Sequence, residues 1–152
     1  MLQFVLRVIF LLCLAMTPLL AQQALPKDAN NWYFGERAGI TFQGDTTTAL
    51  LDGVLISGEG CATVSDRGTG ELLFYTDGVS IWNRNHQQIA TGLLGGSSST
   101  QNVLIVPDPG NSKQYYVFTV PDLTGGDVVV TGMYYSVVSM QNPDGRLLSL
   151  NN

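Results

Sequence analysis

Residues 62–68 read ATVSDRG and residues 104–110 read LIVPDPG, and this near-repetition decides the fold. The Asp and the Gly of the first stretch recur in the second at a constant offset of 42, so that Asp66 corresponds to Asp108. Each stretch reads as a short β-strand that runs into an Asp-x-Gly turn. The pattern predicts a structural unit that the chain uses more than once.

An aromatic segment follows each turn. Residues 74–76 read FYT and residues 117–119 read VFT, which is an offset of 43 and implies one inserted residue. Each unit is therefore expected to hold a strand, a turn, an aromatic strand and further strands. Four strands in about 40 to 45 residues is the spacing of a propeller blade. We predict an all-β, propeller-like stack of four-stranded antiparallel repeats, with a β-sandwich as the alternative.

Short runs rich in Val, Ile, Tyr, Phe and Thr alternate with Gly, Asn, Asp and Pro, which indicates strands and turns. Asp77-Gly78 predicts a two-residue hairpin turn, and Asp52-Gly53 and Asp144-Gly145 are similar. The predicted strands cover residues 32–34, 40–42, 54–56, 62–65, 72–76, 79–82, 103–106, 115–120, 133–138 and 147–150.

The start of the chain predicts a secretory signal peptide over residues 1–21. Arg7 is the only charged residue before Lys27, residues 8–20 are almost wholly apolar, and the small Ala21 precedes two glutamines. A membrane anchor needs about 20 unbroken apolar residues, and Pro18 interrupts this shorter run. Residues 22–152 are then the β-repeat domain.

Residues 22–152 hold about three periods of the repeat, whereas a closed propeller needs at least about four blades. We therefore expect about two to three blades in an incomplete ring, with residues 32–57 supplying a first, irregular unit. We also expect the chain to be the N-terminal part of a larger protein.

Composition excludes several classes of protein. A lipid anchor on Cys13 is rejected because bulky Leu12 precedes it, so Cys61 is the single cysteine after residue 21 and has no disulfide partner. We interpret Cys61 as a small buried hydrophobe, and the lone His86 leaves no zinc site of several Cys or His ligands. Removing Arg7 changes the net charge from −5 to −6, and an acidic chain without a basic cluster excludes nucleic acid.

The sequence offers few candidates for chemistry. His86 lies in a polar turn that we expect to be exposed, and no motif places it beside a serine. Asp66 and Glu71 carry oxygen ligands at a spacing that suggests calcium, but a Gly-rich turn between antiparallel strands explains the same residues without an ion, and we favour the turn. The acids Glu36, Glu59, Glu71 and Asp77 would need to converge in space to hydrolyse a glycoside, and their spacing does not predict that they do.

Most aromatic residues fall in predicted strands, where core packing is their usual role. A subset has polar neighbours and is a candidate rim for a glycan or peptide ligand. That candidate rim comprises Trp82, Asn83, Asn85, His86 and Gln101.

The order of motifs over about residues 30–140 resembles the N-terminal propeller-like region of gliding-motility-associated proteins with a type B sorting domain, which the type IX system secretes. The motifs are NWYFG (31–35), GCA (60–62), SD (65–66), LFYTDG (73–78), WN (82–83), NH (85–86), GLLG (92–95), SSTQ (98–101), IVP (105–107), PG (109–110) and YYVFT (115–119). Residues 1–152 themselves contain no Ig-like module or sorting domain, and in this they depart from that family.

The resemblance implies a non-enzymatic β-repeat module for adhesion, gliding motility or contact with matrix and glycans. Its expected partners are proteins or glycans at the cell surface, and its expected location is secreted, periplasmic or at the cell surface, without a membrane span. The alternatives are a fragment of a propeller enzyme, such as a hydrolase or a quinoprotein-like oxidoreductase with its active site in missing blades, and a fragment without independent function.

The signal peptide gives the first testable prediction. When the chain is expressed in a bacterium with an export pathway, the accumulated protein should begin at Gln22, because the signal peptidase selects the small Ala21. Intact-mass measurement checks this. A product that retains Met1, or one carrying lipid on Cys13, would contradict it.

Overall fold

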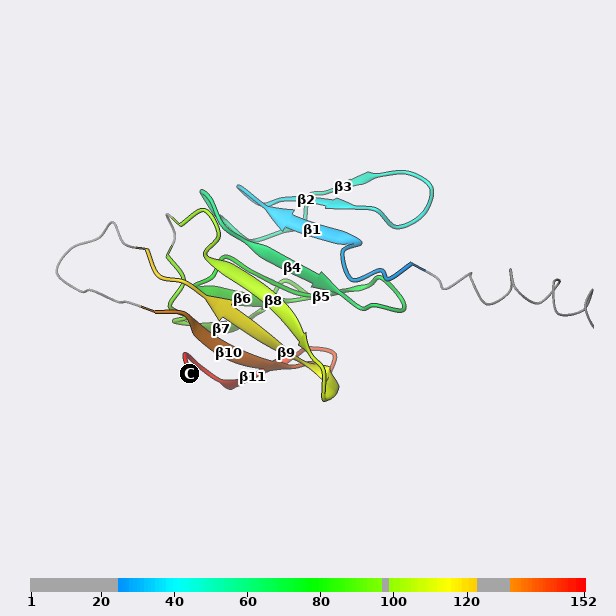
Figure 1. The fold of residues 1–152 in the computed structure, drawn as a ribbon. Helices are drawn as coiled ribbons and strands as arrows, with labels where there is room; N and C mark the ends of the chain where they lie inside the picture. Colours follow the sequence, from blue (N-terminus) through cyan, green and yellow to red (C-terminus); the bar gives the residue numbers. More distant parts are fainter. Residues whose placement is uncertain (1–24, 97–98, 123–131) are drawn as a thin grey trace, which may run out of the picture.

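The computed structural model describes residues 25–96, 99–122 and 132–152, and the predicted signal peptide lies outside these ranges. All regular structure in the described residues is β, in three antiparallel sheets of which none is closed (Figure 1). The first sheet has three strands, β1 (Asn31–Phe34), β2 (Ala38–Thr41) and β3 (Thr48–Leu50).

The second and third sheets have four strands each, in the order β4-β5-β6-β7 and β11-β10-β9-β8. Every strand pairs with its neighbour along the chain, so both sheets are simple meanders, as in a propeller blade. The second sheet contains β4 (Ala62–Ser65), β5 (Leu72–Thr76), β6 (Ser80–Asn83) and β7 (Gln88–Thr91). The third contains β8 (Val103–Asp108), β9 (Asn111–Thr119), β10 (Tyr134–Ser139) and β11 (Arg146–Ser149).

The predicted repeat turns have the same hydrogen bond in both sheets. The Asp66 carboxylate accepts the Gly68 N–H at 2.9 Å, and the Asp108 carboxylate accepts the Gly110 N–H at 2.8 Å. Such a bond stabilises a tight turn and aims the next strand back along the first. The first strand and the Asp turn of each unit were therefore predicted correctly.

The expected offset of 43 in the second strand is wrong. Ala62 pairs with Thr76 and Leu104 pairs with Phe118, so both strands of the hairpin repeat at an offset of 42. The shared Thr suggested the longer offset, but Thr119 pairs with Val103, one step further along the ladder. The repeat is therefore more regular than its sequence identities indicate.

The second sheet lies between the other two and packs on both. One of its faces joins the third sheet in a hydrophobic cluster that includes Phe74, Val117 and Val138, all fully buried. The opposite face packs on the first sheet through Tyr75, which lies with Tyr33 in a second cluster. A twisted four-stranded sheet has two apolar faces, and stacking is what removes both from water.

Turn lengths differ from the predictions. The segment between β5 and β6 is longer than two residues, and of the Asp77-Gly78 pair only Gly78 has a positive φ, +88°. The Asp77 carboxylate accepts the N–H groups of Val79 and Ser80 at 2.8 and 2.7 Å, which widens the turn. The Asp144-Gly145 pair ends a longer connection between β10 and β11.

One predicted strand does not form, and two observed strands were not predicted. Residues 54–56 form only an isolated bridge between Glu36 and Ile56, so Asp52-Gly53 is not a hairpin turn. Strands β3 and β7 were not predicted because they are short, mix polar with apolar residues and are at least partly exposed, and they form by pairing with a neighbouring strand.

The contact between the second and third sheets gives a stability prediction. A Cβ on Gly60 would clash with the Asn102 side chain and lie 2.9 Å from the Asn102 backbone nitrogen. Asn102 is fully buried and donates to the carbonyl oxygens of Asp77 and Gly96, so it has little room to move. Gly60→Ala should lower the free energy of unfolding by about 1–3 kcal/mol in denaturant titration.

Gly58→Ala is the matched control, because a Cβ there meets no atom within 4 Å. It should leave the free energy of unfolding nearly unchanged. Equal losses in the two variants would show that the close packing at Gly60 is not what limits stability.

Candidate functional site

A polar cluster closes the contact between the first and second sheets. The Tyr33 hydroxyl donates to one oxygen of the Asp52 carboxylate at 2.9 Å, and His86 Nε2 lies 3.3 Å from the other oxygen. The second ring nitrogen of His86, Nδ1, is 2.9 Å from the Tyr75 hydroxyl. The Tyr75 hydroxyl also accepts the Val54 N–H at 3.3 Å. The cluster therefore links four separate segments of the chain.

The rings of this cluster are stacked. The Tyr75 ring lies nearly parallel to those of Tyr33 and Trp82, with centroids 4.6 and 5.6 Å away. The His86 ring meets Tyr33 edge to face at 5.5 Å. Offset or edge contacts of this kind add to the stabilisation that burial alone provides. Tyr75 is thus a packing residue with a hydroxyl at the rim.

His86 is not the exposed turn residue that the sequence predicts. Its side chain is 20% exposed, and its backbone has a φ of +60°, which is uncommon for a residue other than glycine. The fully buried Asn83 supports this turn, because its side-chain oxygen accepts the N–H groups of Asn85 and Gln87. The short polar turn therefore directs the imidazole back onto the aromatic rings.

The electrostatics favour a structural role for the cluster. Burial raises the pKa of Tyr33 strongly, its hydrogen bond to Asp52 adds to the rise, and burial also raises the pKa of Tyr75. Partial burial would raise the pKa of Asp52, but the Tyr33 hydrogen bond, a backbone hydrogen bond and the charge of His86 together lower it. Both phenols stay neutral, and the two His86 nitrogens face Tyr75 and Asp52.

The candidate rim is only partly assembled. Trp82, Asn85 and His86 lie at the same end of the second sheet, and the Asn85 side chain donates to the Asp144 carboxylate at 3.1 Å. Asn83 is buried there and donates to the Asp144 carbonyl oxygen, so it does not offer a surface group. Gln101 lies apart from them, close before β8.

The calcium candidates are engaged in the fold. The Asp66 carboxylate accepts the N–H groups of Gly68 and Thr69, and Glu71 lies 3.5 Å from Arg84. Within residues 25–96, 99–122 and 132–152, no three His, Cys, Asp or Glu residues form a group that could hold a metal ion.

Cys61 is a partly buried member of the cluster around Tyr75. Burial, and then the charge of Asp77, raise the pKa of the Cys61 thiol, which disfavours the reactive thiolate. The structure therefore supports its interpretation as a packing residue.

One exposed apolar surface was not predicted as a site. It is the face of the third sheet that points away from the second sheet, and we call it the outgoing face. Strand register places six residues on this face in two cross-strand rows. They are Leu104, Phe118 and Tyr135 in one row and Val106, Tyr116 and Val137 in the other.

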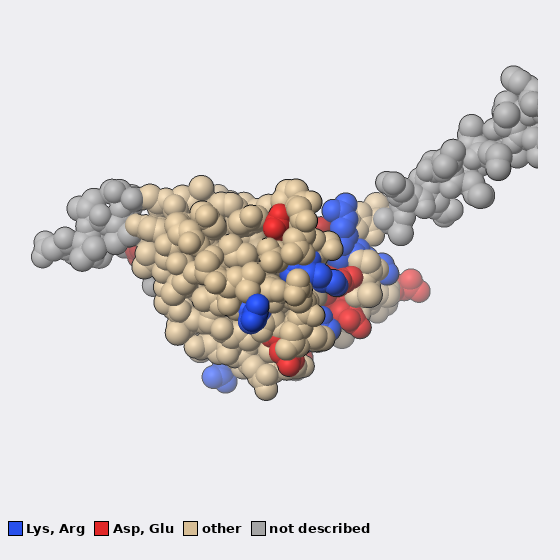
Figure 2. Space-filling view, turned by 90° about the horizontal axis from the view of Figure 1, so that it is seen from below, with Lys and Arg blue, Asp and Glu red and all other residues tan. Residues whose placement is uncertain are grey.

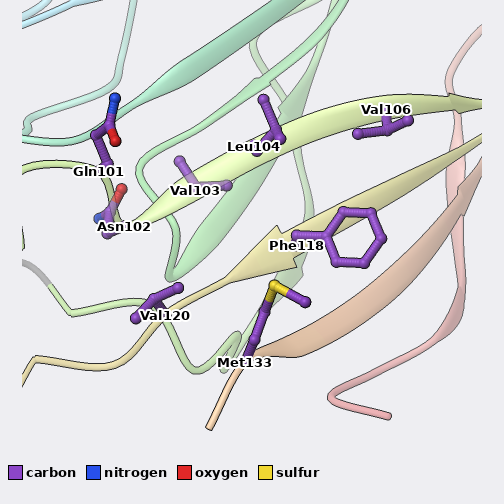
Figure 3. A pocket seen from close by; sticks show the side chains of 8 residues that line it. All are labelled: Gln101, Asn102, Val103, Leu104, Val106, Phe118, Val120 and Met133. Atoms are coloured by element: carbon purple, nitrogen blue, oxygen red, sulfur yellow. The ribbon is translucent and has the colours of Figure 1, made fainter.

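Part of the outgoing face is hollowed. The hollow has a volume of about 480 Å³ and is lined mainly by apolar side chains, among them Leu104, Phe118 and Met133, with Gln101 at its edge (Figure 3). Leu104 is 61% exposed and Met133 is 65% exposed, which is high for residues of this size. Contiguous apolar surface of this kind marks an interaction site more often than it marks an ordinary surface.

Charged residues are absent from the six positions of the outgoing face and occur at the hairpin end of the third sheet, as Asp108 and Lys113. Viewed from below, charged side chains gather towards the right-hand end of the described part of the chain, and few lie on the other half (Figure 2). The repeat itself could have revealed this face, since Val106 and Tyr116 occupy the positions of Val64 and Phe74 in the preceding unit.

No family model, curated protein or solved structure matches the chain. The described residues contain no helix long and apolar enough to cross a membrane. Function is therefore inferred from the geometry of the chain.

The polar cluster predicts a pH dependence of stability. Because the pKa of Asp52 is lower in the folded chain than its unfolded value of about 3.9, the ionised carboxylate stabilises the fold above that pH. This contribution is lost as the pH falls through the folded pKa. Asp52→Asn should therefore be less stable than the parent at pH 7, and the difference should shrink below about pH 4.

Denaturant titrations at several pH values measure this difference. Asp45→Asn, at an exposed carboxylate in the β2–β3 connection, serves as the control. A gap between parent and Asp52→Asn that stays constant down to pH 2 would contradict the assigned role of the Asp52 carboxylate.

Proposed function

We propose that this chain is an exported, non-enzymatic contact module that binds a protein surface through the outgoing face of the third sheet. The observation that carries the proposal is the exposure of an uncharged, aromatic and aliphatic sheet face with a hollow of about 480 Å³. An exposed face of this kind is unfavourable in water unless a partner covers it.

The chemistry of the face favours protein over glycan. Four of its six residues, Leu104, Val106, Phe118 and Val137, have no side-chain hydrogen-bonding group. Sugars present many hydroxyl groups that need partners when they are desolvated. An apolar sheet face is instead complementary to another apolar protein surface.

The state of the candidate catalytic groups also favours a contact role. Both nitrogens of His86 contact Tyr75 and Asp52, and the Cys61 thiol is held in its unreactive form. Export is supported by the predicted signal over residues 1–21, and a role in adhesion or gliding motility by the resemblance of residues 30–140. We place the chain at the surface of the cell or in the periplasm on that basis.

Beads coated with the purified chain should adhere to cells of the producing species, and Leu104→Lys and Tyr135→Lys should reduce adhesion at least tenfold, because each places a charge in an apolar contact. Gln88→Lys, at an exposed strand position of the second sheet, is the control and should adhere like the parent.

Treating the cells with protease should abolish adhesion, and treating them with glycosidases should not. The reverse outcome would identify a glycan ligand instead. Hydrolytic turnover by the purified chain that is lost in His86→Ala or Glu71→Ala would overturn the non-enzymatic assignment.

A further inference from the structure

The two sheet contacts inside the chain follow one rule. The second sheet presents Val64, Phe74 and Ile81 to the third sheet, where Tyr115 and Val117 receive them. The first sheet likewise presents Tyr33 to Tyr75 of the second. In both contacts, one sheet packs the face that it turns towards the next sheet in chain order. The face of that next sheet which receives it, turned towards the preceding sheet, we call an incoming face.

The outgoing face of the third sheet continues this series. Its Val106 and Tyr116 pair with one another as Val64 and Phe74 do, one repeat unit earlier. Val64 and Phe74 are 6% and 0% exposed because the third sheet covers them. Val106 and Tyr116 therefore belong to a face built like one that packs on an incoming face, yet no described residue covers them fully.

The chain also has one incoming face for which the described residues supply no partner. On β1, Asn31 and Tyr33 are buried towards the second sheet, whereas Trp32 and Phe34 point the other way and are 51% and 41% exposed. Ile40 pairs with Trp32 and lies on the same side. Like the outgoing face, this outer face of the first sheet carries no charge at these positions.

We propose that the partner of the outgoing face is a second copy of this chain, bound head to tail so that the outgoing face of each copy packs on the Trp32–Phe34 face of the other. This inference rests on the proposed contact function and names its partner. Two such contacts close the six described sheets of the two copies into a ring around a two-fold axis, which is within the range of about four to eight blades in propellers.

The size of the faces favours the closed pair over an open chain of copies. Four strands about 4.8 Å apart and about six residues long give the outgoing face a flat footprint of roughly 400 Å². The three-stranded first sheet is smaller still, so a single contact is at the low end for specific association. A closed pair makes the contact twice and is correspondingly more stable.

Sedimentation velocity over a range of concentrations tests the proposal on the purified chain, in the processed form that cells accumulate. The parent should form a dimer. Leu104→Lys on one face and Phe34→Lys on the other should each weaken dimerisation at least tenfold, because a lysine would be desolvated in an apolar contact. Gln88→Lys should dimerise like the parent, and circular dichroism should show all variants folded.

Mixing the two variants distinguishes head-to-tail packing from packing of like faces. Each mixed pair retains one intact contact, so a mixture of Leu104→Lys and Phe34→Lys should recover a dimer weaker than that of the parent. If Phe34→Lys dimerises like the parent, the outgoing faces pack on one another and the proposal is wrong.

A parent chain that stays monomeric at all concentrations would also overturn the proposal. The contact function itself would survive that result if beads carrying the chain still adhered to cells and Leu104→Lys abolished their adhesion. The two ideas therefore fail on different measurements.

Discussion

The structure depends on the burial of sheet faces by other sheets. Phe74 and Val117 meet between the second and third sheets, and Tyr75 meets Tyr33 between the second and first, so the middle sheet loses both of its apolar faces to neighbours. Neither contact is local in sequence, and each requires a complete sheet on both sides. The same constraint explains why the two terminal sheets present apolar surface to solvent.

Polar residues at the rims of the sheets secure these contacts. Asp52 and His86 connect the loop after the first sheet to a turn of the second, and Asn83 ties that turn to the loop before β11 through Asp144. Hydrogen bonds at the rim of an apolar interface add direction to packing that is otherwise non-specific.

Local sequence patterns predicted the regular part of the fold well. Strands β4 and β5 match their predicted limits, and the Asp66 and Asp108 turns form as expected, because alternation and turn chemistry act within a few residues. Strand β7 and the role of His86 were missed. Both depend on contacts made by other elements of the fold, and a short strand of mixed residues or a lone histidine carries no local signal of them.

The sequence by itself determined an all-β chain with a blade-length repeat, because strand propensity and Asx turns are properties of short segments. The tertiary structure alone decided which face of each strand is covered. Val64 and Val106 are alike in sequence position, but the first is buried and the second lies on an incompletely covered face, since among the described residues only the first has a following sheet. That difference in coverage, rather than any residue type, locates the contact surface.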